Sequence, residues 1–238
     1  MISVLLLAVR TSALRAPIAI RRSRMAALGR RSRMATLGAG SVEVEEKFAV
    51  SGDRDAFAAR VKAAGGSATS SVRFHDEYFD TAALALTSQD TWLRRRDGAW
   101  ELKIPHGDRV ASGGETTVFR EVEDEAQIVG ELAALGVPGE TLPFPGLDVF
   151  AEFTTFRDKY ALPGRVRVDV DEASYGHRVL ELEVMTDGSP EDVAAARAEI
   201  DAAAAELGCE RLGDGAGGKL ETYLRRYCPA HAKAIGLL

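Results

Sequence analysis

Five segments of this 238-residue chain share one pattern, in which charged positions alternate with largely apolar ones. In VEVEEKF, residues 42–48, a strand would place Glu43, Glu45 and Lys47 on one face, opposite two valines and a phenylalanine. In a single strand of this kind the charged face normally lies in water and the apolar face forms the core. The charged faces here are nearly pure Glu, Asp, Arg and Lys and are segregated by sign, whereas solvated faces usually also carry Thr, Ser and Gln. The pattern therefore raises the question of which face is inside.

The other four segments repeat the pattern. They are WLRRR with Trp92, Arg94 and Arg96, WELK with Glu101 and Lys103, RVRVDVD with Arg165, Arg167, Asp169 and Asp171, and VLELEV with Glu181 and Glu183. Neighbouring carboxylates repel each other unless a cation lies between them, and hard divalent ions take oxygen ligands of this sort. Paired arginines suit phosphate oxygens, which they bind bidentately. If the strands close into a barrel with the charged faces inward, the interior would suit a metal-bound polyphosphate.

Periodicity and turn residues define the elements around these segments. Period-two alternation predicts strands at residues 42–50, 70–79, 90–96, 99–104, 116–122, 150–160, 165–171 and 178–185. Capping residues and helical spacing predict helices at 51–66, 124–136, 189–208 and 219–235, the last broken or kinked at Pro229. Asp97-Gly98 and Pro163-Gly164 mark hairpins. This mostly antiparallel succession indicates an α+β fold with a large sheet or barrel.

The first forty residues differ in composition from the remainder. Residues 1–42 contain eight arginines and no acid, and RRSRMAALG at 21–29 is repeated almost unchanged at 30–38. An acid-free segment rich in Arg, Ser and Ala is typical of organelle transit peptides, so we expect mitochondrial or plastid targeting, with a cytoplasmic location as the alternative. We divide the chain into a basic, poorly ordered extension, residues 1–40, and one folded domain, residues 41–238.

The remaining composition excludes several functions. The chain after residue 42 carries 22 bases and 36 acids, a net charge of −14, so the folded domain is not expected to bind nucleic acid. No apolar run is long enough to span a bilayer, and we expect neither membrane association nor an oligomer. Cys209 and Cys228 are far apart, and the four histidines form no cluster, so neither a disulfide scaffold nor a zinc site is indicated.

An ordered set of motifs resembles the CYTH, or triphosphate tunnel metalloenzyme, superfamily. The set begins with E-x-E-x-K at Glu43, Glu45 and Lys47. It continues with DEYFDT at 76–81, WLRRRDGAWELK at 92–103, FREV at 119–122, FRDKY at 156–160, RVDVDEASYG at 167–176, ELEV at 181–184 and GGKLETYLRRYCP at 217–229. Within that superfamily the order and spacing are similar to those of the animal-type thiamine triphosphatases over residues 41–229. The resemblance implies a closed eight-stranded antiparallel tunnel with flanking helices.

The resemblance also implies an activity and a set of site residues. The activity is hydrolysis of thiamine triphosphate to thiamine diphosphate and phosphate, dependent on Mg²⁺, with Mn²⁺ as the other candidate metal. Matched positions assign metal binding to Glu43, Glu45, Asp169, Glu181 and Glu183. They assign triphosphate binding to Lys47, Arg94, Arg96, Lys103, Arg157 and Lys219. Lys47 and Tyr78 are implied as catalytic, Tyr78 by assisting proton transfer, and Trp92 is implied to lie against the thiamine rings. Glu46, on the apolar face, is expected at an exposed edge.

Other activities of the same tunnel stay open. The substrate could be inorganic triphosphate, a nucleoside triphosphate or an RNA 5′-triphosphate, and the superfamily also includes adenylyl cyclases. A tyrosine in a strand is more often packing than chemistry, and Tyr78 would need a lowered pKa to serve as a base. Asp171 fits a structural ion pair as well as a ligand role. A non-catalytic polyphosphate-binding module is a further alternative, although a mere binder needs fewer carboxylates.

Overall fold

The computed structural model describes residues 42–106, 116–213 and 216–238, all of which belong to the unit Leu37–Leu238. The predicted basic extension, residues 1–40, lies outside the described residues, so its expected targeting role stays a prediction. No helix within the described ranges is long and apolar enough to cross a membrane.

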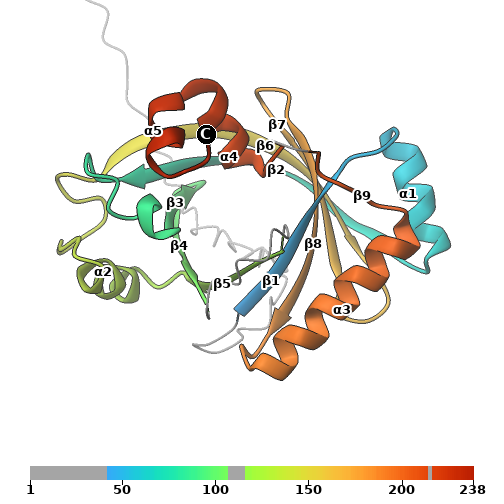
Figure 1. Cartoon of the computed structure of the whole chain (residues 1–238). Helices are drawn as coiled ribbons and strands as arrows, with labels where there is room; N and C mark the ends of the chain where they lie inside the picture. Colours follow the sequence, from blue (N-terminus) through green and yellow to red (C-terminus); the bar gives the residue numbers. More distant parts are fainter. Residues whose placement is uncertain (1–41, 107–115, 214–215) are drawn as a thin grey trace, which may run out of the picture. The chain divides into compact units, whose positions relative to one another are not determined.

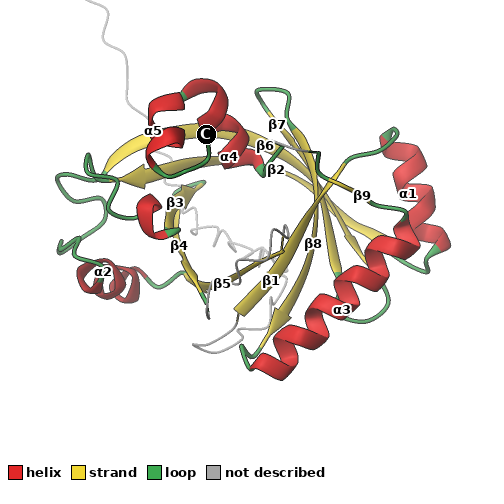
Figure 2. Ribbon diagram, viewed as in Figure 1, coloured by secondary structure: helices red, strands yellow, loops and turns green. Residues whose placement is uncertain are grey.

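Eight strands form a closed antiparallel barrel (Figures 1 and 2). They are β1 (Val42–Ala49), β2 (Ser67–Asp80), β3 (Trp92–Arg96), β4 (Ala99–Pro105), β5 (Thr116–Val122), β6 (Asp148–Ala161), β7 (Arg167–Ala173) and β8 (Arg178–Thr186). Their spatial order is β5-β4-β3-β2-β6-β7-β8-β1, and pairing of β1 with β5 closes the ring. A two-residue strand, β9 (Glu210–Arg211), adds to β1 and was not predicted. The expected eight-stranded antiparallel tunnel fold is therefore confirmed.

The two predicted hairpins have the turn chemistry that the sequence indicated. Asp97 and Gly98 both have positive φ, 48° and 89°, and Arg96 pairs directly with Ala99 across the turn from β3 to β4. Positive φ at both central positions is the type I′ geometry that matches the twist of paired strands. Gly164, with φ 93°, lies in the turn from β6 to β7. The two turns therefore set the pairing register of β3 with β4 and of β6 with β7.

The helices pack outside the barrel, and α1 and α3 begin after residues with capping side chains. They are α1 (Arg54–Ala63), the short 3₁₀ helix η1 (Thr87–Gln89), α2 (Glu125–Ala134), α3 (Pro190–Leu207), α4 (Lys219–Tyr227) and α5 (Pro229–Ala234). Asp53 caps α1 by accepting from the Ala56 amide at 2.8 Å, and Ser189 caps α3 in the same way. Pro229 separates α4 from α5, which confirms the predicted break.

Both faces of β1 are buried, which answers the question of which face is inside. Val44 and Phe48 are at most 2% exposed and pack against α3 residues that include Ile200. Glu43 and Glu45, on the other face, are only 6% and 8% exposed. Figure 1 shows α3 lying across the outside of β8 and β1. The apolar faces therefore turn outward beneath helices, and the charged faces line the barrel interior.

Two expectations about charged residues are wrong. Glu46 is 3% exposed rather than at an exposed edge, because Arg211 of β9 pairs with its carboxylate and Thr116 donates to it at 3.1 Å. Arg165 does not continue the charged face of β7. It precedes that strand and pairs with Asp192 of α3 at 2.6 Å on the outer surface. In both cases a segment distant in sequence supplies the partner, which strand alternation cannot reveal.

Candidate active site

The strand register places oppositely charged interior side chains directly across from one another. The opposed pairs are Asp76 with Arg96, Arg94 with Glu101, Lys103 with Glu121, and Arg157 with Asp171. Their shortest nitrogen–oxygen distances are 2.7, 2.5, 2.7 and 2.6 Å respectively. Opposite charges at facing positions stabilise a sheet. Each of these interior bases is therefore held by a carboxylate of the neighbouring strand.

A group of buried cations occupies one part of the interior. Lys219, the first residue of α4, is 7% exposed and lies 2.6 Å from Glu181 of β8 while also pairing with Asp171. Burial opposes the charge of Lys219 and Arg157, but their facing carboxylates outweigh it, so both pKa values are raised. The helix thus contributes a base to an interior otherwise built from strands, and the triphosphate-binding role predicted for Lys219 stays a prediction.

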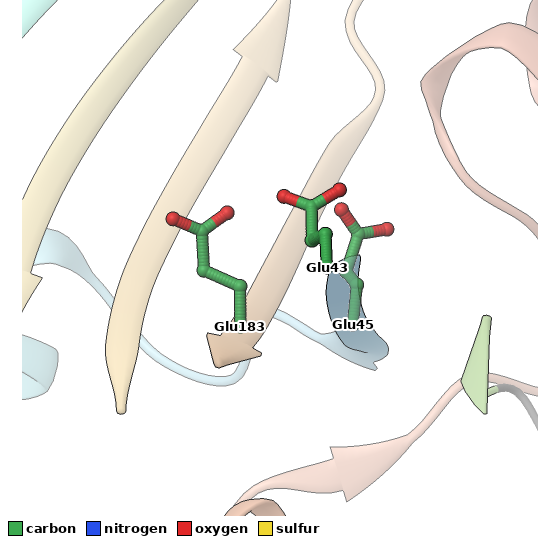
Figure 3. A group of neighbouring side chains, drawn as sticks. All are labelled: Glu43, Glu45 and Glu183. Atoms are coloured by element: carbon green, nitrogen blue, oxygen red, sulfur yellow. The ribbon is translucent and has the colours of Figure 1, made fainter. Parts of the chain in front are cut away.

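Three carboxylates gather in another part of the interior (Figure 3). Glu43 and Glu45 of β1 and Glu183 of β8 each offer an oxygen, and these oxygens lie within 4.8 Å of one another. Glu45 and Glu183 occupy directly facing positions in the β1–β8 register. Like charges at facing positions destabilise a sheet unless a proton or cation intervenes. We call Glu43, Glu45 and Glu183 the acidic triple.

The carboxylates of the acidic triple are unequally balanced: Glu43 and Glu45 each pair with a lysine, and no lysine or arginine of the described residues pairs with Glu183. Burial raises the pKa of Glu183 well above its ordinary value, and the nearby Glu43 and Asp169 raise it further. Burial opposes ionisation of Glu43 as well, but Lys103, at 2.5 Å, outweighs it and lowers the pKa of Glu43 to about 2. A divalent cation would reduce the repulsion among these carboxylates and favour the ionised form of Glu183. The triple therefore fits a hard metal ion with oxygen ligands.

The other two predicted metal ligands lie among cations rather than in the acidic triple. Asp169 and Glu181 face each other across β7 and β8, and Arg157 pairs with both, at 2.6 Å from Glu181. Both oxygens of Asp169 are buried, yet neither accepts a hydrogen bond among the described residues. The guanidinium of Arg157 balances this second like-charged pair. A ligand role for Asp169 and Glu181 stays a prediction.

The structure places Lys47 next to the acidic triple. Its side chain pairs with Glu45, and burial, which opposes the charge, is outweighed by Glu45 and Glu181, so the pKa of Lys47 is raised. Lys47 also lies against the turn before α4, where a Cβ on Gly218 would meet its Cε at 2.7 Å. Lys47 is therefore a fixed cation and not a proton acceptor at neutral pH.

Tyr78 does not have the lowered pKa that a base requires. It is 6% exposed and stacks on Phe153, with ring centroids 5.7 Å apart. Burial raises its pKa, and Asp76 adds to the effect against the opposing cations. The phenol keeps its proton at neutral pH, so a role for Tyr78 as proton acceptor is not supported in the barrel without substrate or metal.

Trp92 lies at the start of β3, directly opposite Lys103 of β4, and is half-buried. Its indole nitrogen donates to a carboxylate oxygen of Asp90 at 3.2 Å. This bond holds the ring at the end of the strand that also carries Arg94 and Arg96. The position is compatible with the predicted contact to an organic group attached to a bound triphosphate.

Sequence reasoning missed several interior residues. Three more charged side chains face the interior, and each pairs with a predicted site residue: Asp76 with Arg96, Glu121 with Lys103, and Lys159 with Asp169. Asp76 is fully buried. Asp76 stands in the motif DEYFDT and Glu121 in FREV, so the motifs were noted but these residues were given no role. The missing signal was the register, because alternation assigns a face but not the residue opposite.

Glu121 is expected to make stability depend on pH. Burial raises its pKa, Lys103 opposes this, and the charges of Glu43 and Glu101 bring the value to about 7. Between the ordinary value of 4.5 and about 7 the folded state binds more protons than the unfolded state, so stability falls as pH rises, by at most about 1.4 kcal/mol per pH unit. Glu121→Gln should remove this loss. The free energy of unfolding by urea is measured with EDTA at pH 5 and 7.5 for the wild-type protein and for Glu121→Gln. An equal change with pH in the two proteins would contradict the prediction.

Comparisons with known proteins agree with this geometry. Residues 41–213 match the family model of the CYTH domain. The thiamine-triphosphatase of Macaca fascicularis is 33% identical over 213 residues, which cover 82% of this chain and 90% of that protein. The human thiamine-triphosphatase is 33% identical over 207 residues, covering 80% and 87%. A solved Pyrococcus horikoshii OT3 structure has the same fold, with a TM-score of 0.52 at 19% identity over 78% of this chain and 99% of that one. The chain therefore belongs to the CYTH domain family, with thiamine-triphosphatases among its relatives.

Proposed function

We propose that this protein hydrolyses thiamine triphosphate to thiamine diphosphate and phosphate. The observation that carries the proposal is the division of one closed barrel interior between the acidic triple and a set of buried bases. Both are needed to hold a metal-bound triphosphate, whereas a barrel interior can be filled as stably by apolar side chains. The two relatives named thiamine-triphosphatase support the choice of substrate.

Mg²⁺ is the metal proposed for the acidic triple, with Mn²⁺ as the other candidate. Glu43, Glu45 and Glu183 would hold it, and Asp169 and Glu181 are the further ligands that the motif resemblance implies. The metal would supply positive charge to the phosphate oxygens and favour deprotonation of a bound water. The raised pKa of Glu183 supports this, because burial and the neighbouring carboxylates disfavour its charge and a bound cation would favour it.

The bases bind the triphosphate and hold it extended. A triphosphate carries about four negative charges, and hydrolysis of its terminal phosphate depends mainly on positioning and charge stabilisation. Arg94 and Arg96 offer two guanidinium groups at i and i+2 of β3, suited to bidentate contact with phosphate oxygens. The remaining charges are balanced by Lys47, Lys103, Arg157 and Lys219. Because Lys47 and Lys219 keep raised pKa values, they act as proton donors in hydrogen bonds and not as bases.

Phosphate release from a panel of substrates tests the proposal. Thiamine triphosphate, tripolyphosphate, ATP and GTP would be compared at equal concentration with Mg²⁺. Faster hydrolysis of tripolyphosphate, or of a nucleoside triphosphate, would replace the proposed substrate but keep the tunnel. Cyclic AMP formed from ATP would reveal a cyclase instead. Tight binding without phosphate release from any member would indicate a non-catalytic polyphosphate-binding module.

Trp92→Ala is expected to lower kcat/KM for thiamine triphosphate by about tenfold while leaving tripolyphosphate hydrolysis within about twofold, since a stacked ring contributes about 1–2 kcal/mol. Only the organic half of the substrate has a ring for the indole to contact. Trp100→Phe is the control, because Trp100 belongs to the core on the outer face of β4, with its ring 4.8 Å from that of Phe79. Equal losses on both substrates in Trp92→Ala would remove the stacking role.

The basic extension is proposed to direct the protein to a mitochondrion or plastid. The support is compositional: eight arginines and no acid in residues 1–42, with a repeated Arg-Ser motif. Fusing residues 1–40 to a fluorescent protein tests it. A diffuse cytoplasmic signal would favour the alternative location.

A further inference from the structure

We infer that Asp76 is a positioning residue, which acts through Arg96 to aim its guanidinium at the triphosphate, with Phe74 as the second support. This inference rests on the proposed function. It concerns how one of the phosphate-binding bases is held, and it assigns roles to two residues of β2 that the motif comparison left without any.

Asp76 and Phe74 hold the guanidinium of Arg96 in place, Asp76 along one edge and Phe74 against one face. Asp76 accepts from Arg96 Nε at 2.7 Å through Oδ1 and from Nη2 at 2.9 Å through Oδ2. These two parallel bonds prevent rotation of the guanidinium in its own plane. The Cζ atom of Arg96 lies 3.9 Å from the centroid of the Phe74 ring, so the ring supports the flat face of the group. Asp76 is 0% exposed and Phe74 is 7% exposed, so neither support moves freely in water.

This arrangement leaves one corner of the guanidinium available. Nε and one hydrogen of Nη2 are used by Asp76, and among the described residues no side chain accepts a hydrogen bond from Nη1. A planar guanidinium held on one edge presents its remaining donors in a fixed direction. An oxyanion binding there need not immobilise the side chain first, which lowers the entropy cost of binding.

The surroundings of Asp76 point to the same role. Arg94 and Lys219 also lie close enough to act on its charge, and with Arg96 they hold its pKa below the ordinary value despite the opposing effect of burial. Asp76 thus lies among three bases that are expected to contact phosphate, and these bases favour its charged form. A buried carboxylate placed for stability alone needs only one such partner.

The adjacent residues provide a matched comparison. Glu77 of β2 faces Arg95 of β3 and makes the same bidentate pair, with both nitrogen–oxygen distances at 2.8 Å. The two pairs lie one residue apart on the same two strands. Because alternation sends Glu77 and Arg95 to the outer surface, their pair can serve the sheet but cannot reach the interior. A difference between the two pairs in function therefore measures what the inner pair contributes beyond joining β2 to β3.

The experiment compares Asp76→Asn with Glu77→Gln in the full chain. Kinetics on thiamine triphosphate with Mg²⁺ and calorimetric binding of tripolyphosphate without metal are measured on both. Asp76→Asn is expected to lower kcat/KM by about ten- to a hundredfold and to weaken tripolyphosphate binding, which is the range for a lost charge-assisted hydrogen bond. Glu77→Gln is expected to change either quantity by less than about threefold. Equal effects of the two substitutions would overturn the inference.

A double-mutant cycle separates positioning from a structural role. If Asp76 acts through Arg96, then adding Asp76→Asn to Arg96→Ala should cause little further loss of kcat/KM, although each single change lowers it. Additive losses would overturn the inference. Should Asp76→Asn fail to fold, Phe74→Leu tests the same claim with every charge retained, and is expected to lower kcat/KM several-fold; unchanged kinetics would overturn it. If the wild-type protein binds tripolyphosphate but releases no phosphate, the proposed hydrolysis is refuted. The positioning role of Asp76 is then decided by comparing tripolyphosphate binding in Asp76→Asn and Glu77→Gln.

Discussion

Glu45→Gln is expected to lower kcat for triphosphate hydrolysis by at least about a hundredfold and to weaken Mg²⁺ binding in parallel, because it removes an anionic ligand from the acidic triple. Glu45 faces Glu183 directly across β1 and β8, so a neutral amide there also removes the repulsion that makes a cation favourable. The substitution nearly keeps side-chain volume, and Lys47, which loses its partner Glu45, still lies near Glu181, so folding should be retained in the absence of metal. Phosphate release and metal titration by calorimetry measure the two effects.

Glu46→Gln is the matched control for that substitution. Glu46 is the next residue of β1, it is also buried at 3% exposure, and it also accepts from a cation, Arg211. It lies on the outer face of the strand, where no metal is expected. Since the Arg211 side chain is 61% exposed, its charge is not stranded in the core, and we expect a loss of only about 1 kcal/mol in stability with kcat nearly unchanged. A hundredfold loss of kcat in Glu46→Gln would contradict the assignment of the two faces.

Arg157→Met is expected to destabilise the protein by about 3–5 kcal/mol, because it leaves buried carboxylates without their principal cation. Arg157 pairs with Asp169, Asp171 and Glu181, each at most 4% exposed. Methionine keeps much of the aliphatic volume, so the loss is electrostatic. The orphaned carboxylates should then have raised pKa values and bind protons in the folded state. The deficit relative to wild type should therefore shrink as pH falls from 7.5 to 5, which urea unfolding at the two pH values measures.

Arg165→Met is the control for Arg157→Met, because it removes an arginine that is paired with acids on the outer surface and not in the barrel interior. Arg165 also contacts two acids, Asp192 and Glu199 of α3, at 2.6 and 2.8 Å. Its side chain is 40% exposed, so solvent screens the interaction, and we expect a loss of at most about 1 kcal/mol with no dependence of the deficit on pH between 5 and 7.5. If Arg157→Met has an equally small, pH-independent effect, then the interior carboxylates are not balanced in the way described.

The strands were predictable because their signal is local. Alternation in VEVEEKF, WLRRR and VLELEV fixes which residues share a face, and Asp97-Gly98 fixes one hairpin, each within fewer than ten residues of sequence. All eight predicted strands are present, with bounds that differ by a few residues at most, and the four predicted helical regions are present as well. The two-residue β9 was missed because so short a strand has no period of its own. It exists through its pairing with Phe48 and Ala49.

The partners within the site were not predictable in the same way. Motif comparison placed five carboxylates in one metal-binding set, but the structure gathers Glu43, Glu45 and Glu183 and leaves Asp169 and Glu181 with Arg157. Nothing local in the sequence distinguishes Glu181 from Glu183, since both lie on the same face of β8. The difference arises because the register sets Glu183 opposite Glu45 of β1, whereas it sets Glu181 opposite Lys47 of β1 and Asp169 of β7.

The sequence by itself therefore determined which side chains share a face, the number of main strands and the order of the motifs, because side-chain alternation and turn chemistry act over a few residues. The repeated pattern in five strands and the motif resemblance indicated that the charged face is the inner one; the tertiary structure confirmed this and alone decided which charges meet there. That outcome depends on closure of β1 onto β5 and on α3 covering the apolar face, both of which join residues far apart in the chain. Once the apolar side chains are buried beneath helices, the charged side chains have only the barrel interior left to occupy, and register then selects each partner.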